Sequence, residues 1–327
     1  MDHNPVSSHQ LGHFFHVDGK QLGQQYKDHF SDYHDWDQRE HAQEWMLFAE
    51  NVGERLSIDE TALSQGELYT IVTNKAAAGR KGALVAMIKG TRAEDISAVL
   101  EKIPWQLRKK VKEVTLDMAA TMIKAVRRSF PNASRVIDRF HVQKLAFDAV
   151  QELRIKYRWE AINEENEAIT NAKRKNETYE PEILANGDTL KQLLARSRYL
   201  LFKHQSKWTL SQFERANLLF ERYPKLDQAY KLSVQLGNIF TYSRAKEDAF
   251  KKLGIWYQQV EKSGIDAFNT VCKSVQAHYL HILNYFNNRS TNASAESFNA
   301  KIKAFRASSR GVRDITFFLY RLKNIYA

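Results

Sequence analysis

The order of the apolar segments is the feature that most constrains the fold of this 327-residue chain. Three segments rich in β-branched residues come first, at residues 55–63, 67–75 and 83–90, and short turns separate them. Such segments predict three antiparallel strands in a meander. Two further strand-like segments, at 111–117 and 134–142, each follow a stretch with helical periodicity. The core therefore begins with consecutive strands and continues with alternating helices and strands.

This order, β-β-β-α-β-α-β, predicts an α/β core of the RNase H-like type. A Rossmann fold is excluded, because it alternates from the start and carries a glycine-rich phosphate loop, and the sequence has neither feature. Between residues 142 and 285 the strand signals stop and helices with charged faces are predicted. We expect four parts: an acidic, histidine-rich N-terminal arm (1–50) with a short helix over 38–50, the first part of the core (51–145), an all-α insertion (146–285), and the C-terminal helices of the core with a third carboxylate (286–327).

Composition sets the broad class of protein. Hydrophobic residues make up 43% of the chain, which is enough to bury a core. The single cysteine, Cys272, excludes disulfides and cysteine-based zinc sites. No apolar run reaches the length of a transmembrane helix, and no apolar signal segment opens the sequence. These features indicate a cytoplasmic protein with no membrane partner.

Charge is distributed unevenly along the chain, whose net charge is +11. Residues 1–60 hold 4 Lys and Arg against 12 Asp and Glu, whereas residues 61–327 hold 45 against 26. A basic body favours a polyanionic partner such as DNA, with a generic basic soluble protein as the alternative. The acidic residues 1–60 (the acidic head) are expected to dock on a basic partner or on the basic residues 61–327 of the same chain (the basic body). Its seven histidines lack metal-site spacing, so a solvated arm is favoured there over a metal site.

Three carboxylates far apart in the sequence fall where this fold brings segments together. Asp59 lies in the first predicted strand, Asp117 ends the fourth, and Glu296 lies in the first turns of a helix that packs on the sheet. Hard oxygen ligands from separate segments can hold two Mg²⁺ ions roughly 3.5–4 Å apart at a phosphodiester. Taken singly, each Asp is also explained as a turn or cap residue and the Glu as a partner of the helix dipole. The combination favours a metal site, because both Asp residues fall on the strands that this topology pairs.

Asp138 and His141 form a second group at the end of the fifth predicted strand. Their spacing predicts an imidazole beside the metal site, oriented by Asp138. The alternative is a capping Asp with a packed His.

The segment after Glu296 is basic and has only one opposing carboxylate, Asp314. It predicts a surface that follows DNA phosphates, with a solvated helix face as the alternative. The basic residues are Lys301, Lys303, Arg306, Arg310 and Arg313.

Three stretches carry a resemblance to a known family. They are VTLDMAATMIKAVRRSFPNASRVIDRFHVQK, RAKEDAF and NASAESFNAKIKAFRASSRGVRDITFFLYRL. Over residues 50–327 the chain resembles bacterial insertion-sequence transposases of the ISL-three family, within the DDE superfamily. The resemblance implies an RNase H-like core interrupted by a helical insertion, two Mg²⁺ ions with Mn²⁺ as a substitute, cleavage at element ends, and strand transfer by the freed 3′-hydroxyl. It assigns catalysis to Asp59, Asp117 and Glu296, with Asp138 and His141 as the accessory motif.

The chain departs from longer members of that family, which begin with a zinc-binding helix-turn-helix region. We therefore expect a separate helix-turn-helix protein, or a fused upstream frame, to recognise the element ends. A homo-oligomer is expected in the synaptic complex, acting on DNA at the bacterial nucleoid. Two alternatives stay open: an RNase H-like nuclease without strand transfer, and a domesticated DNA-binding protein without catalysis.

Overall fold

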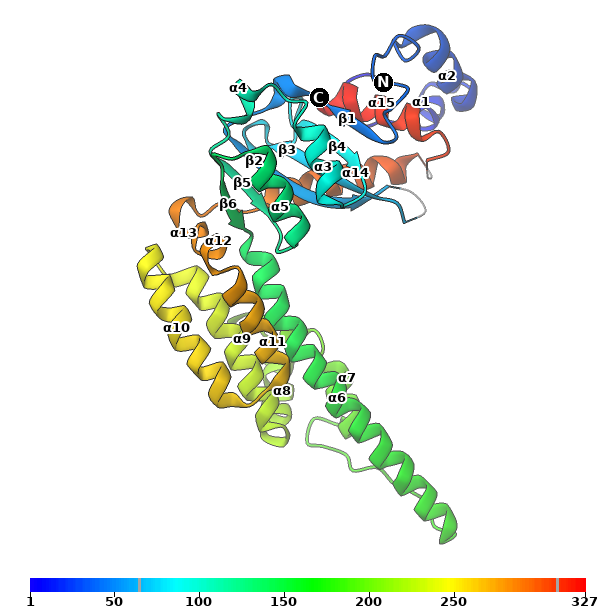
Figure 1. Cartoon of the computed structure of the whole chain (residues 1–327). Helices are drawn as coiled ribbons and strands as arrows, with labels where there is room; N and C mark the ends of the chain where they lie inside the picture. The colour runs from blue at the N-terminus through cyan, green and yellow to red at the C-terminus, as the bar shows by residue number, and fades with distance from the viewer. Residues whose placement is uncertain (64–65, 310–311) are drawn as a thin grey trace. The chain divides into compact units, whose positions relative to one another are not determined.

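The computed structural model describes residues 1–63, 66–309 and 312–327 and divides into two compact units (Figure 1). The sheet unit comprises residues 1–138 and 288–327, and the helical unit comprises residues 139–287. The sheet unit carries the mixed sheet and the segments that cover it, and the helical unit is built from helices.

Six strands form one mixed sheet in the order β1-β4-β3-β2-β5-β6. The central strands β2, β3 and β4 pair antiparallel, as the meander predicts, and β1 adds antiparallel to β4. On the other side of β2, strands β5 and β6 add in parallel. The bounds are β1 Trp45–Leu47, β2 Arg55–Ala62, β3 Leu68–Asn74, β4 Leu84–Lys89, β5 Glu113–Leu116 and β6 Ser134–Ile137. All five strands predicted from the sequence are therefore present, in a sheet of the α/β type. The fifth is shorter than predicted, because β6 ends at Ile137 and residues 139–142 begin a helix.

The helix predicted over residues 38–50 does not form, and a strand lies within this range instead. Trp45–Leu47 is the edge strand β1, and a short 3₁₀ helix, Ala49–Asn51, follows it. Two hydrogen bonds of 2.8 Å extend the pairing of β1 with β4. The Phe48 amide donates to the Val85 carbonyl, and the Lys89 amide donates to the Glu44 carbonyl. Met46 is fully buried against the sheet. Pairing with β4 and burial of this side chain outweigh the local preference for a helix.

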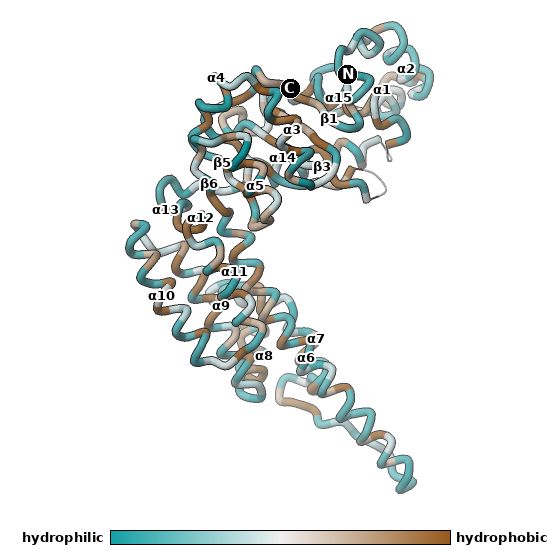
Figure 2. Tube along the Cα trace, in the orientation of Figure 1, coloured by the Kyte–Doolittle hydropathy of each residue, from teal (hydrophilic) through white to brown (hydrophobic). Residues whose placement is uncertain are grey.

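Helices cover both faces of the sheet, because each strand alternates its side chains between the faces. On one face, α3 (Ala93–Leu100) and α5 (Ala120–Ser129) pack on a core that includes Ile58. On the other face, α14 (Ala293–Ser308) and α15 (Ile315–Tyr326) pack on a second core. Figure 2 shows the hydrophobic residues concentrated in the strands and on parts of the helices. The short helix α4 (Trp105–Arg108) precedes β5.

The catalytic-helix candidate α14 packs as its sequence predicts. Phe298, Ile302 and Phe305 are its buried stripe, each no more than 3% exposed. They belong to the same core as the strands of the meander and helix α15. The helix is thus fixed along the sheet by an apolar face, which leaves its other faces for polar contacts.

The N-terminal segment is not a solvated arm, which corrects the expectation for the arm within residues 1–50. It forms α1 (Ser8–Phe15), α2 (Gly19–Gln25) and a π-helical turn (Tyr26–Phe30). Tyr33 packs edge-on against Phe317 and Tyr320 of α15. The Arg321 guanidinium donates hydrogen bonds to three backbone carbonyls within the first six residues. The acidic head therefore docks on the body of this same chain.

The helical unit contains the helices that the sequence predicts between β6 and α14. Trp256 of α10 is fully buried and its indole N–H donates to the Leu232 carbonyl of α9 at 2.9 Å, which joins two of them. Within the described ranges, no helix is long and apolar enough to cross a membrane. The helices are α6 Arg139–Arg174, α7 Leu190–Arg196, α8 Leu210–Arg222, α9 Pro224–Tyr242, α10 Lys246–Ser263, α11 Asp266–Ala277, α12 Tyr279–Leu283 and α13 Tyr285–Asn288.

Candidate active site

Three aspartates lie in a row across adjacent parallel strands. Continuing the β2–β5 register two residues past its last pair places Asp59 beside Asp117. Continuing the β5–β6 register by one residue places Asp117 beside Asp138. The amide of Asp138 donates to the Leu116 carbonyl at 3.0 Å, so the second ladder extends to this residue. Partners in register share a face, and the three aspartates therefore form a row on one face of the sheet.

Helix α14 is attached to both ends of this aspartate row. The side-chain amide of Asn299 donates to Asp59 Oδ2 at 2.8 Å. The backbone amide of Asn292, the residue that precedes α14, donates to Asp138 Oδ2 at 2.8 Å. Both contacts are made at buried or half-buried positions. The row therefore faces α14, and the helix runs along it.

Glu296 lies between these two attachments along the helix. Residues four and three positions apart share a helix face, so Asn292, Glu296 and Asn299 form one stripe. Glu296 is exposed and lies in the first turn of α14. Among the residues that the structure describes, no three His, Cys, Asp or Glu side chains are placed to hold a metal ion. The structure thus puts Asp59 beside Asp117 and carries Glu296 on the helix that passes them, without gathering all three around one point.

The donor set nevertheless fits magnesium in its chemistry, because carboxylate oxygens from three segments are hard ligands. Two hydrogen bonds orient the aspartates: the Glu60 amide donates to Asp59 Oδ1 and the Ala119 amide to Asp117 Oδ1, each at 2.9 Å. Burial raises the pKa of Glu60, and the negative charges of Asp117 and Asp59 raise it further. Carboxylates are therefore crowded around Asp59 and Asp117, which favours a bound cation.

Asp138 and His141 occupy different settings. Asp138 is only 2% exposed, and one of its oxygens holds the start of α14. His141 lies in the first turn of α6, in the helical unit. Among the described residues its Nε2 has no hydrogen-bond partner. The orienting role of Asp138 toward His141 stays a prediction, and one contact of Asp138 is with the residue that precedes α14.

A buried charged cluster, which sequence reasoning did not find, holds the chain just before α14. Lys75 donates to Thr115 Oγ1 at 2.8 Å and to the Ser290 hydroxyl, which in turn donates to Glu113. Asn288 donates to the other oxygen of Glu113 at 3.2 Å. Burial lowers the pKa of Lys75, and Glu113 is 4% exposed. The available signal was the position of Glu113 between the apolar residues Val111 and Val114 of a predicted strand, since a buried charge requires partners.

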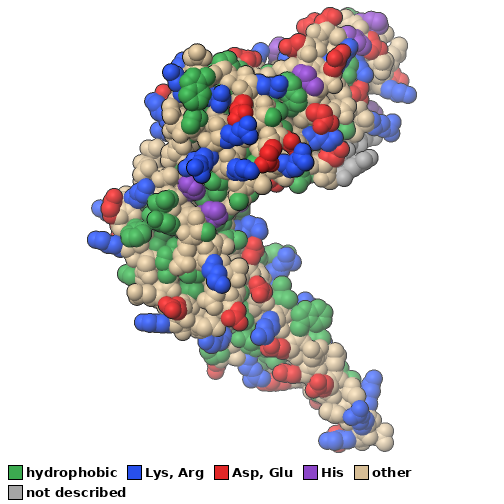
Figure 3. Space-filling view, viewed as in Figure 1, with side chains coloured by type: hydrophobic (Ala, Val, Ile, Leu, Met, Phe, Trp, Pro, Cys, Tyr) green, Lys and Arg blue, Asp and Glu red, His purple; other side chains and the backbone are tan. Residues whose placement is uncertain are grey.

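The predicted basic residues divide into two kinds. Lys301 donates to the Gly79 carbonyl at 2.8 Å, and Arg306 donates to the Ala62 carbonyl at 3.5 Å, so both tie α14 to the sheet. Lys303 and Arg313 are exposed. Arg310 lies outside the described residues. Figure 3 shows basic and acidic side chains interspersed over the visible face of the sheet unit.

Comparison with known proteins identifies the family to which this chain belongs. A family model described as "Transposase", for DDE transposases of the ISL-three type, matches residues 56–322. The chain belongs to this family, which confirms the resemblance seen in the sequence. It is also 25% identical over 272 residues to the transposase for insertion sequence element IS1001 from Bordetella parapertussis. That match covers 83% of this chain and 60% of the relative, so the chain spans about 60% of the relative's length. No solved structure matches the chain.

Proposed function

We propose that this protein is a DNA transposase that cleaves DNA at the ends of an insertion sequence and joins the freed 3′-hydroxyl to target DNA. The observation that carries the proposal is the row of Asp59, Asp117 and Asp138 with α14 attached along it. Membership of the transposase family supports the same conclusion from an independent direction.

The core that we propose for this activity is RNase H-like. Its support is the strand order, in which an antiparallel meander is extended by two parallel strands on the far side of the first meander strand. The helical unit enters the sequence between β6 and α14, which agrees with an insertion before the final catalytic helix.

Asp59, Asp117 and Glu296 are the residues that we propose to hold two Mg²⁺ ions, or Mn²⁺ in their place. When bound, such ions stabilise the developing charge on the attacking and leaving oxygens of the phosphodiester. Asn299 fixes one oxygen of Asp59, and the Glu60 amide fixes the other, so that carboxylate is oriented before any ligand arrives.

Asp138 is proposed as a positioning residue, because its carboxylate holds the start of the helix that carries Glu296. The cluster of Lys75, Glu113 and Ser290 also helps to position α14, since it fixes the chain two residues before Asn292. His141 is proposed as an accessory group that donates to the scissile phosphate.

Recognition of DNA is proposed to need more than this chain. The exposed Lys303 and Arg313, together with Lys301, Arg306 and Arg310, are proposed to contact phosphates, which positions DNA without reading its sequence. A helix-turn-helix partner or a fused upstream frame is proposed to recognise the ends. A homo-oligomer is proposed to hold two ends at once, as the joining reaction requires.

A strand-transfer assay with pre-cut element ends, a supercoiled target and Mg²⁺ tests the proposal. We expect joined product with the wild type, none with Asp117→Asn, and the wild-type level with Asp95→Asn, a half-exposed carboxylate of α3 that pairs with Arg92. Hydrolysis without joining identifies a nuclease instead. DNA retention without cleavage or joining in the wild type identifies a non-catalytic DNA-binding protein. Product from Asp117→Asn rejects the site.

A further inference from the structure

Helix α6 is the longest helix among the described residues. It has 36 residues, whereas α9, the next longest of the described helices, has 19. Figure 1 shows the C-terminal half of α6 extending past the other helices of the helical unit. A short helix without neighbours is only marginally stable in water, because most helical stability comes from packing of an apolar face. The extended half of α6 is therefore expected to have packing partners.

One face of this extended half is packed within the chain. Ala161, Glu165 and Ala168 line a cavity together with residues of the segment 179–191, which returns beside the helix. Lys191 of that segment forms an ion pair with Glu165 at 2.6 Å. The three α6 positions are four and three residues apart, so they share one face of the helix. The return segment thus packs on this face.

A second face of α6 carries apolar side chains that are open to solvent. Ile155 is 45% exposed and Trp159 is 61% exposed, and Ile162 and Ile169 are half-buried. Together with Asn166 they recur in alternating steps of four and three residues, which is the spacing of the seam of a coiled coil. These five residues are called the α6 seam. It lies about a third of a turn around the helix from the packed face.

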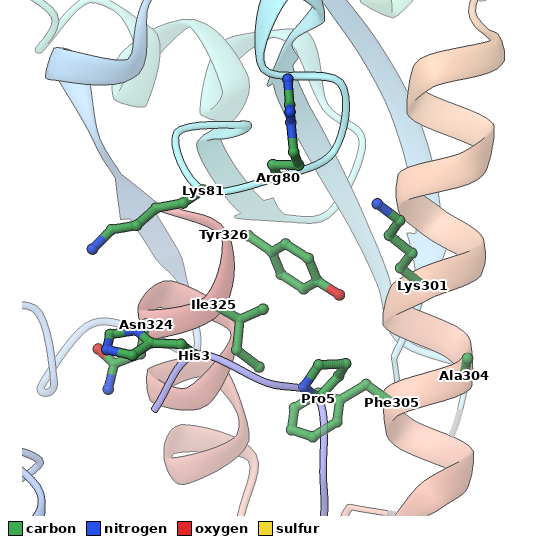
Figure 4. A pocket seen from close by; sticks show the side chains of 10 residues that line it. All are labelled: His3, Pro5, Arg80, Lys81, Lys301, Ala304, Phe305, Asn324, Ile325 and Tyr326. Carbon is green, nitrogen blue, oxygen red and sulfur yellow. The ribbon is translucent and has the colours of Figure 1, made fainter. Parts of the chain in front are cut away.

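The exposure of Trp159 contrasts with the aromatic residues of the sheet unit. Phe305 and Tyr326 line the cavity drawn in Figure 4, and they are only 3% and 4% exposed. Phe305 stacks on Phe318, with ring centroids 5.2 Å apart. These rings already have partners within the chain, whereas most of the Trp159 side chain is in water. An apolar stripe with a large exposed aromatic residue marks an interaction surface.

The charges beyond the two ends of the α6 seam are complementary to a second copy of this chain. Asp148 and Glu152 continue the seam toward the N-terminus at the same spacing, and both are exposed. Lys173 continues it toward the C-terminus, and Arg174 and Lys175 follow. Two antiparallel copies place the acidic end of each seam against the basic end of the other. A parallel pair would place like charges together, which is unfavourable.

We propose that two copies of this protein associate through antiparallel pairing of their α6 seams. Trp159 packs against Ile162 of the second copy, and by two-fold symmetry Ile162 packs against the second Trp159. This register buries the most exposed ring of the seam at the centre of the interface, where binding energy is concentrated. The pairing rests on the proposed function only in that it names the surface of the homo-oligomer proposed to hold two DNA ends.

The same register determines the other contacts along the seam. Ile155 lies opposite Asn166, and Asp148 lies opposite Lys173. Asp148 also accepts from Lys144 of its own chain, through Oδ2 at 2.7 Å, which leaves Oδ1 for Lys173 of the second copy. These outer ion pairs form at exposed positions, so they set the orientation of the pair more than its affinity.

Sedimentation equilibrium of the full chain, without DNA or metal, measures the association. We expect the wild type to form dimers as its concentration rises from about 1 to about 100 μM. Trp159→Glu should weaken dimerisation at least about tenfold, as expected for a central tryptophan. Phe213→Glu is the control, at an aromatic residue of α8 that is 51% exposed, and it should dimerise like the wild type. A wild type that stays monomeric, or a Trp159→Glu variant that dimerises like the control, overturns the proposal.

Charge reversal tests the orientation. Asp148→Lys and Lys173→Glu should each weaken dimerisation by about tenfold, because each turns attraction into repulsion at both ends of the dimer. The double variant should regain the wild-type affinity. Glu214→Lys changes the charge by the same amount as Asp148→Lys at an exposed position of α8, and its affinity should stay within about twofold of the wild type. Wild-type affinity in both single variants overturns the antiparallel register.

Cross-linking covers the case in which a charge variant does not fold. In a Cys272→Ser background, which removes the free thiol, Ile155→Cys and Asn166→Cys proteins are mixed under mild oxidation. The antiparallel register predicts a disulfide-linked dimer in the mixture and none with either protein alone. A cross-link formed by Asn166→Cys alone shows parallel pairing and overturns the proposal, as does a mixture without any cross-link. Failure of dimerisation is distinguishable from failure of the transposase proposal, because these measurements contain no DNA and strand transfer is assayed separately.

Discussion

At the scale of single residues, the candidate site is a group of carboxylates whose orientations are fixed by hydrogen bonds. Asp59 and Asp117 each accept from a nearby backbone amide, and Asn299 donates to Asp59. Their charges contribute to the raised pKa of Glu60. Repulsion among these carboxylates destabilises the folded protein, and a divalent cation bound beside them, as proposed, would reduce that repulsion.

Replacing Glu60 tests this electrostatic description. The folded protein holds the Glu60 proton more tightly than the unfolded chain does, so the free energy of unfolding falls as pH rises through the pKa of Glu60 in the folded state. Glu60→Gln removes this loss. At pH 8 we expect the free energy of unfolding to exceed that of the wild type by less than about 1 kcal/mol, because the group is partly solvated, and the Tm to be correspondingly higher. Near pH 4 the gain should be smaller. Thermal melts across this range measure it, and a gain that does not vary with pH contradicts the explanation.

Metal addition tests the proposed ligands. A cation that binds only the folded protein raises its stability, by about 2.7 kcal/mol when its concentration is a hundred times its Kd. We expect Mn²⁺ to raise the Tm of the wild type and EDTA to reverse the rise. Asp59→Asn and Asp117→Asn should abolish the shift, and Asp95→Asn should retain it. An unchanged shift in both site variants would show that the metal binds elsewhere.

At the scale of elements, the position of α14 decides the geometry of the site. The helix is held by its buried stripe, by Asn299 at one end of the aspartate row and by Asp138 at the other. The charged cluster of Lys75, Glu113 and Ser290 fixes the chain that enters it. Glu296 can be brought to Asp59 and Asp117 only as precisely as these contacts position the helix.

Asp138 variants separate a positioning role from metal binding. Asp138→Ala leaves the buried amide of Asn292 without its acceptor, which we expect to cost about 1–3 kcal/mol in the free energy of unfolding. Asp138→Asn keeps an acceptor oxygen and should retain most of this stability. Chemical denaturation measures both. If Asp138→Asn also keeps the Mn²⁺-induced rise in Tm, Asp138 is a positioning residue, whereas loss of that rise makes it a metal ligand.

The charged cluster is tested by a double-mutant cycle. Lys75→Met leaves Glu113 buried without its cation, and we expect a loss of about 3–5 kcal/mol. Glu113→Gln should cost a similar amount for the same reason. The double variant should be more stable than the sum of the two losses allows, because neither charge is then left alone. Additive losses in denaturant titrations would show that the two residues act independently.

Local pattern predicted most of these elements and part of the site. The five strands and the stripe of Phe298, Ile302 and Phe305 follow from periodicity that a single segment carries. Strand β1 was missed, because its pairing partner in β4 lies about forty residues away in the sequence. The contacts of Asn292 and Asn299 with the aspartate row join segments more than 150 residues apart, and no local pattern encodes them.

At the scale of the whole molecule, the chain combines a sheet unit with a separate helical unit. The sheet unit contains the aspartate row, α14 and the docked acidic N-terminal segment. Composition predicted the basic body and the acidic head, but the packing of Tyr33 and Arg321 that joins them depends on α15, almost three hundred residues later. The function proposed here belongs to this assembled unit, since its carboxylates come from three distant segments.

Diffraction from crystals of the protein bound to a pre-cut element end and Mn²⁺ tests the central claim most directly. The anomalous signal of manganese locates each ion without reference to the protein coordinates. We predict two manganese peaks, with carboxylate oxygens of Asp59, Asp117 and Glu296 as the protein ligands. Peaks bound by other residues, or an occupied DNA end with these three carboxylates far from any peak, would contradict the account.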